Sequence, residues 1–203
     1  MKEYPTINSK CAPNLPCLAF QKLDGSNVRF EWSKKNGFYK FGTRNRLFDA
    51  SDEMFGSAIK LFQDKYADDV SKIILKHKQY REAQYVVCFA EFFGPSSFAG
   101  WHDATETHDV VLFDVAVHKH GILDAKQFID LFGGLHIPEI IYDGNYGQQF
   151  RQDVYEGKYI DKSFEGIVAK GGTGHKMWMS KQKTKAWLDK LKEKHPDSFD
   201  ELA

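Results

Sequence analysis

A hairpin near the start of the chain constrains the fold more than any other feature. Residues 28–32 alternate apolar and charged side chains, which is the period of a strand with one buried face. Asn36 and Gly37 follow, and this pair favours the positive φ angles of a tight hairpin turn. Residues 38–43 then predict the returning strand. Because so short a turn joins antiparallel strands, the sequence predicts an antiparallel sheet.

Later segments predict helices and further strands. Hydrophobic residues recur at helical spacing from Met54 to Tyr66, with Asp49 or Ser51 available as the N-terminal cap, and the pattern continues to His77. Strands are also predicted at residues 18–22, 85–93, 110–117, 164–170 and 177–183, and helices at residues 124–132 and 187–194. Since hairpins come first and helices are inserted between later strands, the predicted class is α+β with mainly antiparallel sheets.

Composition narrows the class of protein further. The 203 residues are 42% hydrophobic and 15% aromatic, which predicts a globular domain with a buried core. No apolar run reaches the roughly 18 residues that span a bilayer, and the first residues do not resemble a signal peptide. The cysteines, Cys11, Cys17 and Cys88, lack the spacing of a metal site, which favours a reducing, cytoplasmic location. Basic and acidic residues balance at 28 each, which argues against binding nucleic acid by overall charge alone.

The strongest chemical signal is the segment of residues 22–27, in which a lysine at the end of a predicted strand precedes an Asp-Gly turn. A lysine has an ordinary pKa of about 10.4 and is a poor nucleophile while protonated. Nearby cations and a divalent metal would favour the neutral amine of Lys22, which can attack an α-phosphate. Gly25 would let the backbone pass close to a nucleotide. An ordinary turn beside a surface lysine explains the same residues equally well, because such turns are common.

Two acids lie in otherwise apolar segments. Glu91 shares one face of its predicted strand with Val87 and Phe89, and Glu165 opens the segment that runs to Lys170. A buried carboxylate without a partner is costly, so each acid needs a ribose hydroxyl, a cation or a metal-bound water. Two embedded acids suit metal coordination in phosphoryl transfer, while a structural ion pair is the alternative.

A pair of lysines and one aromatic residue complete the set of candidates. Lys181 and Lys183 are two residues apart, so they share one strand face and could neutralise charge on a transferring phosphate. Alone, such a pair is more often part of a solvated surface. Phe113, just before Asp114, could stack on a base, although most core phenylalanines do not.

In order, these features resemble the covalent nucleotidyltransferase superfamily of ligases and RNA-capping enzymes. Residues 22–27 resemble its lysine motif, and residues 89–94 resemble its third motif. Residues 113–114 are similar to the strand that follows the third motif. Residues 165–170 resemble the fourth motif, and residues 181–183 resemble the fifth. An asparagine at position 27 resembles the RNA ligase 2 branch, whereas DNA ligases and capping enzymes more often carry arginine at that position. Tyr4 and Pro5 near the start also resemble that branch.

The resemblance implies a single adenylylation domain over residues 1–203, with antiparallel sheets around an ATP pocket. Lys22 would accept AMP from ATP, Glu91 and Glu165 would serve the ribose and a Mg²⁺ or Mn²⁺ ion, and Phe113 would stack on adenine. Lys181 and Lys183 would contact the α-phosphate. The nucleotide-binding residues that it implies are Lys22, Asn27, Arg44, Glu91, Phe113, Glu165, Lys181 and Lys183.

Two further positions leave an alternative open. Arg44 matches the arginine expected after the hairpin, with Arg46 as a plausible substitute. Lys170 falls at a family lysine position, but simple alternation puts it on the face opposite Glu165 unless the strand is bulged. It therefore stays outside the predicted set.

The resemblance implies an RNA substrate with 5′-phosphate and 3′-hydroxyl ends. Family members usually continue into a second domain, often an OB fold, whereas this chain ends at Ala203. Self-adenylylation should then survive more readily than strand joining, and a separate protein could position the RNA. A DNA ligase or capping-type guanylyltransferase would use the same lysine, and a non-catalytic module that binds nucleotides or RNA ends is a third interpretation. NAD is the less favoured AMP donor, because no additional N-terminal domain is present to hold its nicotinamide half.

Overall fold

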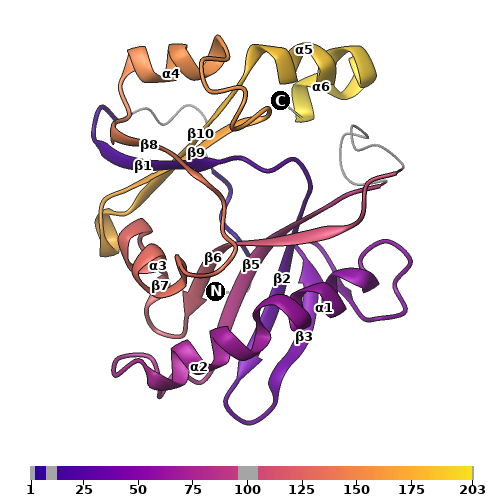
Figure 1. The fold of residues 1–203 in the computed structure, drawn as a ribbon, viewed down its shortest axis with the longest axis vertical. Coiled ribbons are helices and arrows are strands. Elements are labelled where there is room, and N and C mark those ends of the chain that lie inside the picture. Colours follow the sequence, from indigo (N-terminus) through magenta and orange to yellow (C-terminus); the bar gives the residue numbers. More distant parts are fainter. Residues whose placement is uncertain (1–2, 8–12, 96–104, 203) are drawn as a thin grey trace. The chain divides into compact units, whose positions relative to one another are not determined.

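The computed structural model describes residues 3–7, 13–95 and 105–202. The chain divides into two compact units, one made of Met1–Pro5 and Gly25–Ile137 and the other of Thr6–Asp24 and Pro138–Ala203. Figure 1 labels the helices and strands of both units. The chain passes from the second unit to the first between Asp24 and Gly25, inside the lysine motif.

The first unit is built on a six-stranded antiparallel sheet with the strand order β4-β3-β2-β5-β6-β7. Its strands are β2 (Ser26–Ser33), β3 (Gly37–Thr43), β4 (Leu47–Phe48), β5 (Val86–Phe93), β6 (Asp109–Val117) and β7 (Gly121–Ile122). Its helices are α1 (Gly56–Phe62), the π-helical turn η1 (Gln63–Ala67), α2 (Asp68–Lys76) and α3 (Ala125–Phe132).

The helices of the first unit cover one face of its sheet, and Figure 1 shows α1 and α2 lying across the strands. The apolar side chains of β2, among them Phe30, pack with Phe62 of α1 and Phe128 of α3 in one buried cluster. The rings of Phe30 and Phe62 stack with centroids 3.8 Å apart. Since strand residues alternate between faces, the polar residues of β2 point to the opposite face of the sheet.

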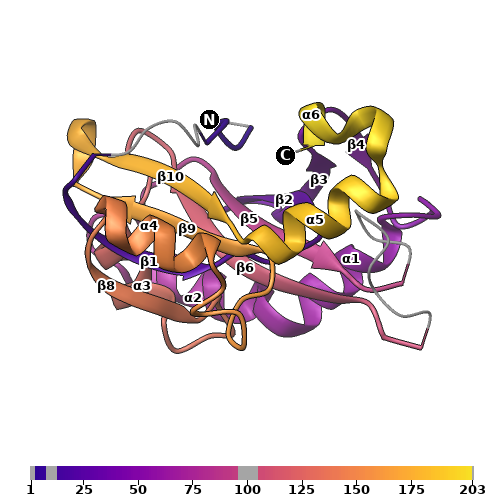
Figure 2. The ribbon, with the colours of Figure 1, turned by 90° about the horizontal axis from the view of Figure 1, so that it is seen from above.

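The second unit is built on a four-stranded antiparallel sheet with the order β10-β9-β1-β8. Its elements are β1 (Pro16–Gln21), β8 (Ile140–Asn145), α4 (Gln148–Tyr155), β9 (Gly166–Gly171), η3 (Gly174–Lys176), β10 (Trp178–Lys183), α5 (Lys185–Lys194), η4 (Pro196–Ser198) and α6 (Phe199–Leu202). Figure 2 shows α4 over the strands and α5 leaving the end of β10. Phe150 and Val154 of α4 pack on Ala19, Ile167 and Ala169.

The structure confirms the α+β class and the hairpin but changes two local details. Only Gly37 has a positive φ angle (65°) in the hairpin, and Ser33 pairs with Gly37, so the turn is a three-residue connection rather than a two-residue one. Neither predicted cap starts α1. Asp52 instead accepts the N–H groups of Met54 and Phe55 just before the helix begins at Gly56, because its short side chain reaches those amides.

The longest elements that were not predicted from the sequence are β8 and α4. The strand β8 contains an Asp-Gly pair, which is typical of a turn, and α4 buries only Phe150 and Val154 among polar residues. Both form because neighbouring elements supply their partners: β8 pairs with β1, and α4 covers the sheet.

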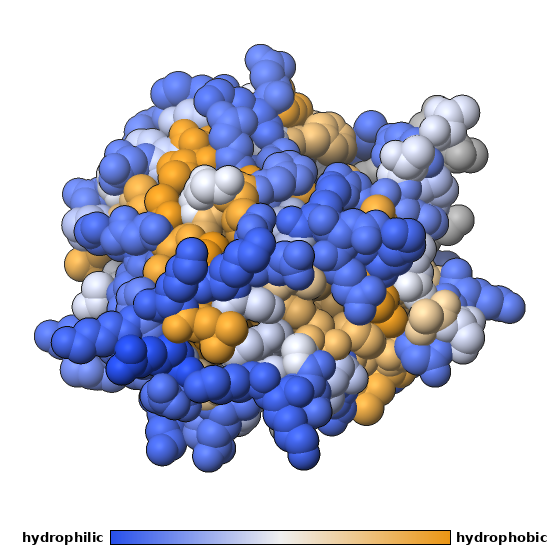
Figure 3. Space-filling model, turned by 60° about the horizontal axis from the view of Figure 1, so that its bottom comes forward, coloured by the Kyte–Doolittle hydropathy of each residue, from blue (hydrophilic) through white to orange (hydrophobic). Residues whose placement is uncertain are grey.

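Figure 3 shows a face on which hydrophilic side chains surround separate hydrophobic areas. Within the described ranges, no helix combines the length and apolar character that crossing a bilayer requires. Cys17 and Cys88 are buried and free, while Cys11 lies outside the described residues.

Candidate active site

The candidate residues fall into two groups, one in each compact unit. In the second unit, Lys22 directly follows β1, and its backbone N–H donates to the carbonyl oxygen of Gly166 over 2.9 Å. The same N–H lies 3.2 Å from Oγ of Ser163. These bonds continue the pairing of β1 with β9 by one residue, so the base of the lysine side chain is held by the sheet.

The ammonium group of Lys22 meets the carboxylate of Glu165, with 2.7 Å between Nζ and Oε1. The lysine side chain is 21% exposed, whereas the glutamate side chain is only 4% exposed. Burial raises the pKa of the Glu165 carboxyl, and the charge of Lys22 opposes that shift. One residue of the lysine motif and one of the fourth motif therefore form a partly buried ion pair.

Lys183, at the end of β10, is buried beside this ion pair. Burial lowers the pKa of its ammonium group to about 8, and the charges of Lys181 and Lys22 act in the same direction. Glu165 and Asp24 oppose the shift. The second unit thus gathers cations and acids from three motifs into one electrostatic cluster.

Lys170 shares a sheet face with the paired lysines, which favours the irregular-strand alternative that the sequence left open. It pairs with Met179 on β10, while Lys181 pairs with Val168, so Lys170 and Lys181 point the same way. Counting alternation from Glu165 was misleading, because that residue precedes β9 and Gly166 has a φ angle of 139°. Lys170 is 4% exposed, and its Nζ lies 5.0 Å from the ring centroid of Phe20.

In the first unit, Asn27 and Glu91 stand directly opposite each other on β2 and β5. Both lie on the sheet face away from the helices, as alternation predicted for Glu91. Gly25 is packed against β5, since a Cβ atom there would come within 2.5 Å of the carbonyl oxygen of Phe92. This close contact between strands is a structural reason for a glycine at that position.

Phe113 is the extra residue of a β-bulge. The pairing of β5 with β6 shifts between Phe89 and Ala90, whose partners are Asp114 and Leu112, so Phe113 has no partner of its own in the strand register. A bulge redirects the side chain that it leaves unpaired. The half-buried ring of Phe113 meets the ring of Tyr4 edge-on, with centroids 5.0 Å apart.

Tyr4 also holds a buried acid on this face. Its hydroxyl donates to Oδ2 of Asp114 over 2.5 Å, and Asp114 is fully buried. Burial and the charge of Asp114 raise the pKa of the tyrosine hydroxyl well above its usual value, so it stays a donor at neutral pH.

We expect Tyr4→Phe to lower the free energy of unfolding by about 1–3 kcal/mol, because a hydrogen bond to a buried carboxylate is lost while the ring packing remains. Urea unfolding measures this change. Tyr39→Phe is the matched control, since Tyr39 is 46% exposed, and it should leave stability unchanged. Equal stability of Tyr4→Phe and the wild type would show that the hydrogen bond contributes nothing.

The two arginines after the hairpin differ in their contacts. Arg46 forms an ion pair with Asp52 and lies over the ring of Phe55. Arg44 is exposed, and in the part of the chain that the structure describes no ion pair holds it. Arg44 is therefore the more available of the two for an anionic ligand.

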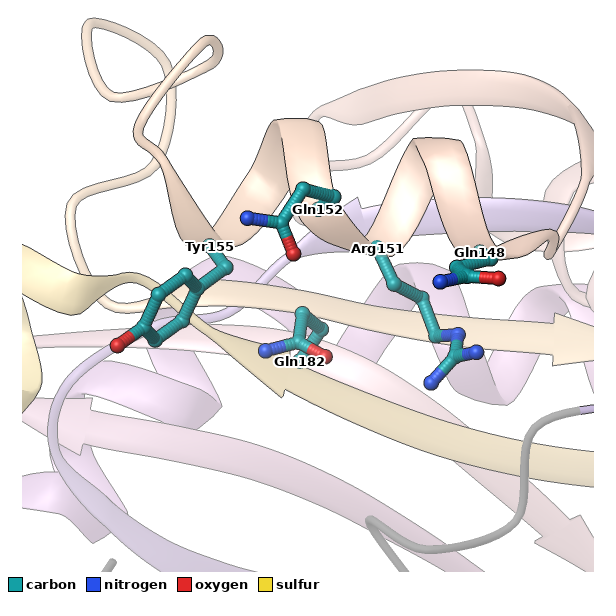
Figure 4. Close-up of a pocket in the computed structure, with 5 residues that line it drawn as sticks. All are labelled: Gln148, Arg151, Gln152, Tyr155 and Gln182. Atoms are coloured by element: carbon teal, nitrogen blue, oxygen red, sulfur yellow. The ribbon is translucent and has the colours of Figure 1, made fainter.

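A cavity of about 390 Å³ opens on the other face of the second sheet. It is lined by Gln148, Arg151, Gln152, Tyr155 and Gln182. Figure 4 shows the first four residues on α4 and Gln182 on β10. Since Gln182 alternates with its lysine neighbours, this cavity lies on the opposite side of β10 from Lys181 and Lys183. The residues predicted to act on a nucleotide do not line this cavity.

The described residues contain no cluster of three or more His, Cys, Asp or Glu side chains that could hold a metal ion. In Glu165, however, the buried Oε2 atom accepts no hydrogen bond from the described residues. Mg²⁺ typically keeps several waters and is bound by one or two carboxylates together with substrate phosphates. The residues present therefore fit a metal that arrives with a nucleotide rather than a site made by protein ligands alone.

Sequence reasoning missed Ser163 and Trp187 in this group of residues. Ser163 contacts the backbone of Lys22, and Trp187 contacts Asp24 and Lys183. A signal for Trp187 was available: Thr184 is a favoured helix cap directly after the paired lysines, and it places the next turn of helix beside them.

Comparison with known proteins gives the family of the chain and similar folds. A family model described as RNA ligase matches residues 16–188. A Naegleria gruberi RNA ligase variant with AMP and Mn is similar in fold, with 18% identity, a TM-score of 0.64, and coverage of 97% of this chain and 59% of that chain. The same ligase with PPi gives 16% identity, a TM-score of 0.63, and coverage of 95% and 60%. None of the curated proteins compared with the chain matches it.

Two antiparallel sheets and the match to the family model define an RNA ligase-like fold. The match to the family model spans most of the sequence, and the chain belongs to the RNA ligase family. It spans about three fifths of the length of the Naegleria gruberi ligase chains.

Proposed function

We propose that this protein uses ATP to join RNA ends through AMP carried on Lys22. The observation that carries the proposal is the 2.7 Å contact between Lys22 Nζ and buried Glu165, with the charge of Lys183 acting on the same cluster. The RNA ligase family match supports RNA as the substrate. The Naegleria gruberi structures with ATP or AMP and Mn support ATP and a divalent metal.

In the first step, Lys22 must lose a proton before it can act as a nucleophile. Glu165 is within hydrogen-bonding reach of the amine, and burial raises its pKa, so its carboxylate can hold that proton. The neutral amine then forms a bond to the α-phosphorus of ATP. The bond from that phosphorus to the bridging oxygen breaks, and pyrophosphate leaves.

Two further transfers complete the reaction. An oxygen of the RNA 5′-phosphate attacks the same phosphorus and displaces the amine of Lys22, which leaves AMP on the RNA end. The 3′-hydroxyl of the other end then attacks the RNA 5′-phosphorus, and AMP departs as the new phosphodiester bond forms. The substrate is therefore RNA with 5′-phosphate and 3′-hydroxyl ends.

The other residues divide between the phosphates and the nucleoside. We assign Lys181 and Lys183 to the α-phosphate, where fixed positive charge stabilises the transition state. We assign Asn27, Glu91 and Phe113 to the ribose and base, and Arg44 to an anionic group of the substrate. A divalent cation served by Glu165, Glu91 and the phosphates would supply further charge neutralisation.

Labelling with ATP that carries a radioactive α-phosphate tests the proposal. The protein should form an adduct that acid releases and alkali does not, as expected of a phosphoramidate. GTP should label poorly, and nicked RNA should be sealed in preference to nicked DNA. If the wild-type protein takes up no label from ATP or GTP, the enzyme proposal fails and a non-catalytic binding module becomes the better interpretation.

Positioning of the RNA should involve more than these residues. The Naegleria gruberi ligase chain extends well beyond the part that this chain matches. We propose that further protein, from a partner or from additional sequence, helps to hold the RNA ends, so sealing should be weaker than self-adenylylation. A reducing cytoplasmic location suits the free, buried thiols of Cys17 and Cys88.

The rate of self-adenylylation should fall as the pH rises above about 8, because Lys183 then loses the charge that we assign to it. Arginine remains protonated throughout this range, so Lys183→Arg should remove the alkaline decline. The measurement is the initial labelling rate over about three pH units centred on the lowered pKa of Lys183.

The pKa of Lys183 is lower in the folded protein than in the unfolded chain. The free energy of unfolding should therefore rise as the pH increases from about 8 to about 10.5.

Lys181→Arg is the matched control for this experiment and should keep the alkaline decline. A decline that persists unchanged in Lys183→Arg would assign it to another group.

A further inference from the structure

Trp187 is a fully buried residue in the first turn of α5. Its backbone N–H donates to Oγ1 of Thr184 over 3.1 Å, which closes the helix cap. Thr184 is itself anchored, since its hydroxyl donates to the carbonyl oxygen of Phe164 over 2.7 Å and its N–H to that of Glu165 over 3.0 Å. The indole ring is therefore held in place by the same backbone that carries Glu165.

The indole contacts two charged residues from different motifs. Its N–H donates to Oδ2 of Asp24 over 3.2 Å. The Nζ atom of Lys183 lies 4.0 Å from the ring centroid, within the range of a cation–π contact. Asp24 is two residues from Lys22 in sequence, so this one ring connects the lysine motif with the fifth motif.

A mobile ammonium group would have to be ordered during each reaction, and a lysine side chain loses up to about 2 kcal/mol of rotamer entropy when it is fixed. Lys183 is 7% exposed and already rests on a rigid ring. Charges that are ordered before the reaction need no reorganisation in the transition state. In the folded protein, Trp187 therefore already restricts the position of the Lys183 ammonium group.

We propose that Trp187 is a positioning residue for self-adenylylation, which fixes Asp24 of the lysine motif and Lys183 in one arrangement. The inference rests on the proposed function, because it assigns Trp187 to the step in which Lys22 accepts AMP. Trp187 acts through these two residues and is not itself a catalytic group.

Two substitutions separate the contacts. Trp187→Phe keeps an aromatic face for Lys183 but removes the N–H that holds Asp24, and we expect the labelling rate at saturating ATP to fall about tenfold. Trp187→Leu removes both contacts, and we expect a fall of about a hundredfold. The KM for ATP should stay within about twofold, because the lost interactions serve the transition state more than ground-state binding.

Trp178→Phe is the matched control. Trp178 lies on the same strand as Lys183 but packs against Tyr146 in the core of the second unit, with ring centroids 5.7 Å apart. The same chemical change there should leave the labelling rate at the wild-type value. Thermal unfolding of all three variants establishes the folded fraction, and each rate is corrected for it.

The outcomes distinguish this inference from the proposed function. Absence of label on the wild-type protein overturns the proposed function itself. A labelled wild type together with a wild-type rate in Trp187→Phe overturns only the role of Trp187. That role is also overturned if the labelling rate of Trp187→Phe falls only in proportion to its folded fraction. The same holds if the change is confined to the KM for ATP.

Discussion

Replacing Lys22 with alanine is expected to eliminate the covalent attachment of AMP. The amine is the only group that the proposal lets bond to the α-phosphorus, and alanine offers no nucleophile in its place. Labelling with α-phosphate-labelled ATP, followed by denaturing electrophoresis, measures the adduct. Joining of RNA that already carries a 5′-adenylate bypasses this step, so Lys22→Ala should retain measurable activity on that substrate.

Lys158→Ala is the matched control for the loss of a lysine in the same unit. Lys158 is 61% exposed and pairs with Asp153 over 2.8 Å, and the proposal gives it no part in the reaction. It should label like the wild type. An adduct that persists in Lys22→Ala would place the nucleophile elsewhere, and peptide mapping of the adduct would then identify it.

Replacing Gly166 with alanine is expected to lower both the stability of the protein and the rate of labelling. Gly166 has a φ angle of 139°, and a Cβ atom there would lie 2.1 Å from the carbonyl oxygen of Gln182. Since the obstacle is backbone of the paired strand, a rotamer change cannot remove it. We expect a loss of about 3 kcal/mol or more in the free energy of unfolding, which corresponds to a drop of about 6–12 °C in Tm.

Labelling should fall with stability in Gly166→Ala, because Gly166 accepts the backbone hydrogen bond of Lys22 and pairs with Lys183. Two glycine controls separate the causes. Gly174 has a φ angle of 54° with open space around it, so Gly174→Ala should cost only about 1–2 kcal/mol. Gly134→Ala meets nothing within 4 Å and should stay within about 0.5 kcal/mol of the wild type. A melting curve of Gly166→Ala that matches the wild type would contradict the crowding seen at this strand pair.

The parts of the fold that could be predicted are those with strong local patterns. Alternation identified β2, because one-sided burial imposes a period of two. The continuous apolar segments identified β5 and β6, because both faces of these strands are covered. The helix α3 was also recognisable, since Asp124 and Gln127 form the capping box that starts it.

The elements that escaped prediction depend on partners far away in the sequence. The strand β8 is recognisable only through its pairing with β1, and the bulge at Phe113 exists only because β5 and β6 shift in register. Alternation alone could not decide the face of Lys170, because the backbone at Gly166 departs from a regular strand. Local residue patterns carry no information on any of these pairings.

Residue identity alone predicted the chemistry, from an amine at a strand end, two acids in apolar segments and paired cations in an order that resembles RNA ligases. Which of these groups meet was decided by strand register, which brings Glu165 to Lys22 and sets Asn27 opposite Glu91. The reason is physical. The reactivity of a side chain depends on its own functional group. Its neighbours depend on hydrogen bonds between strands that are remote in the chain.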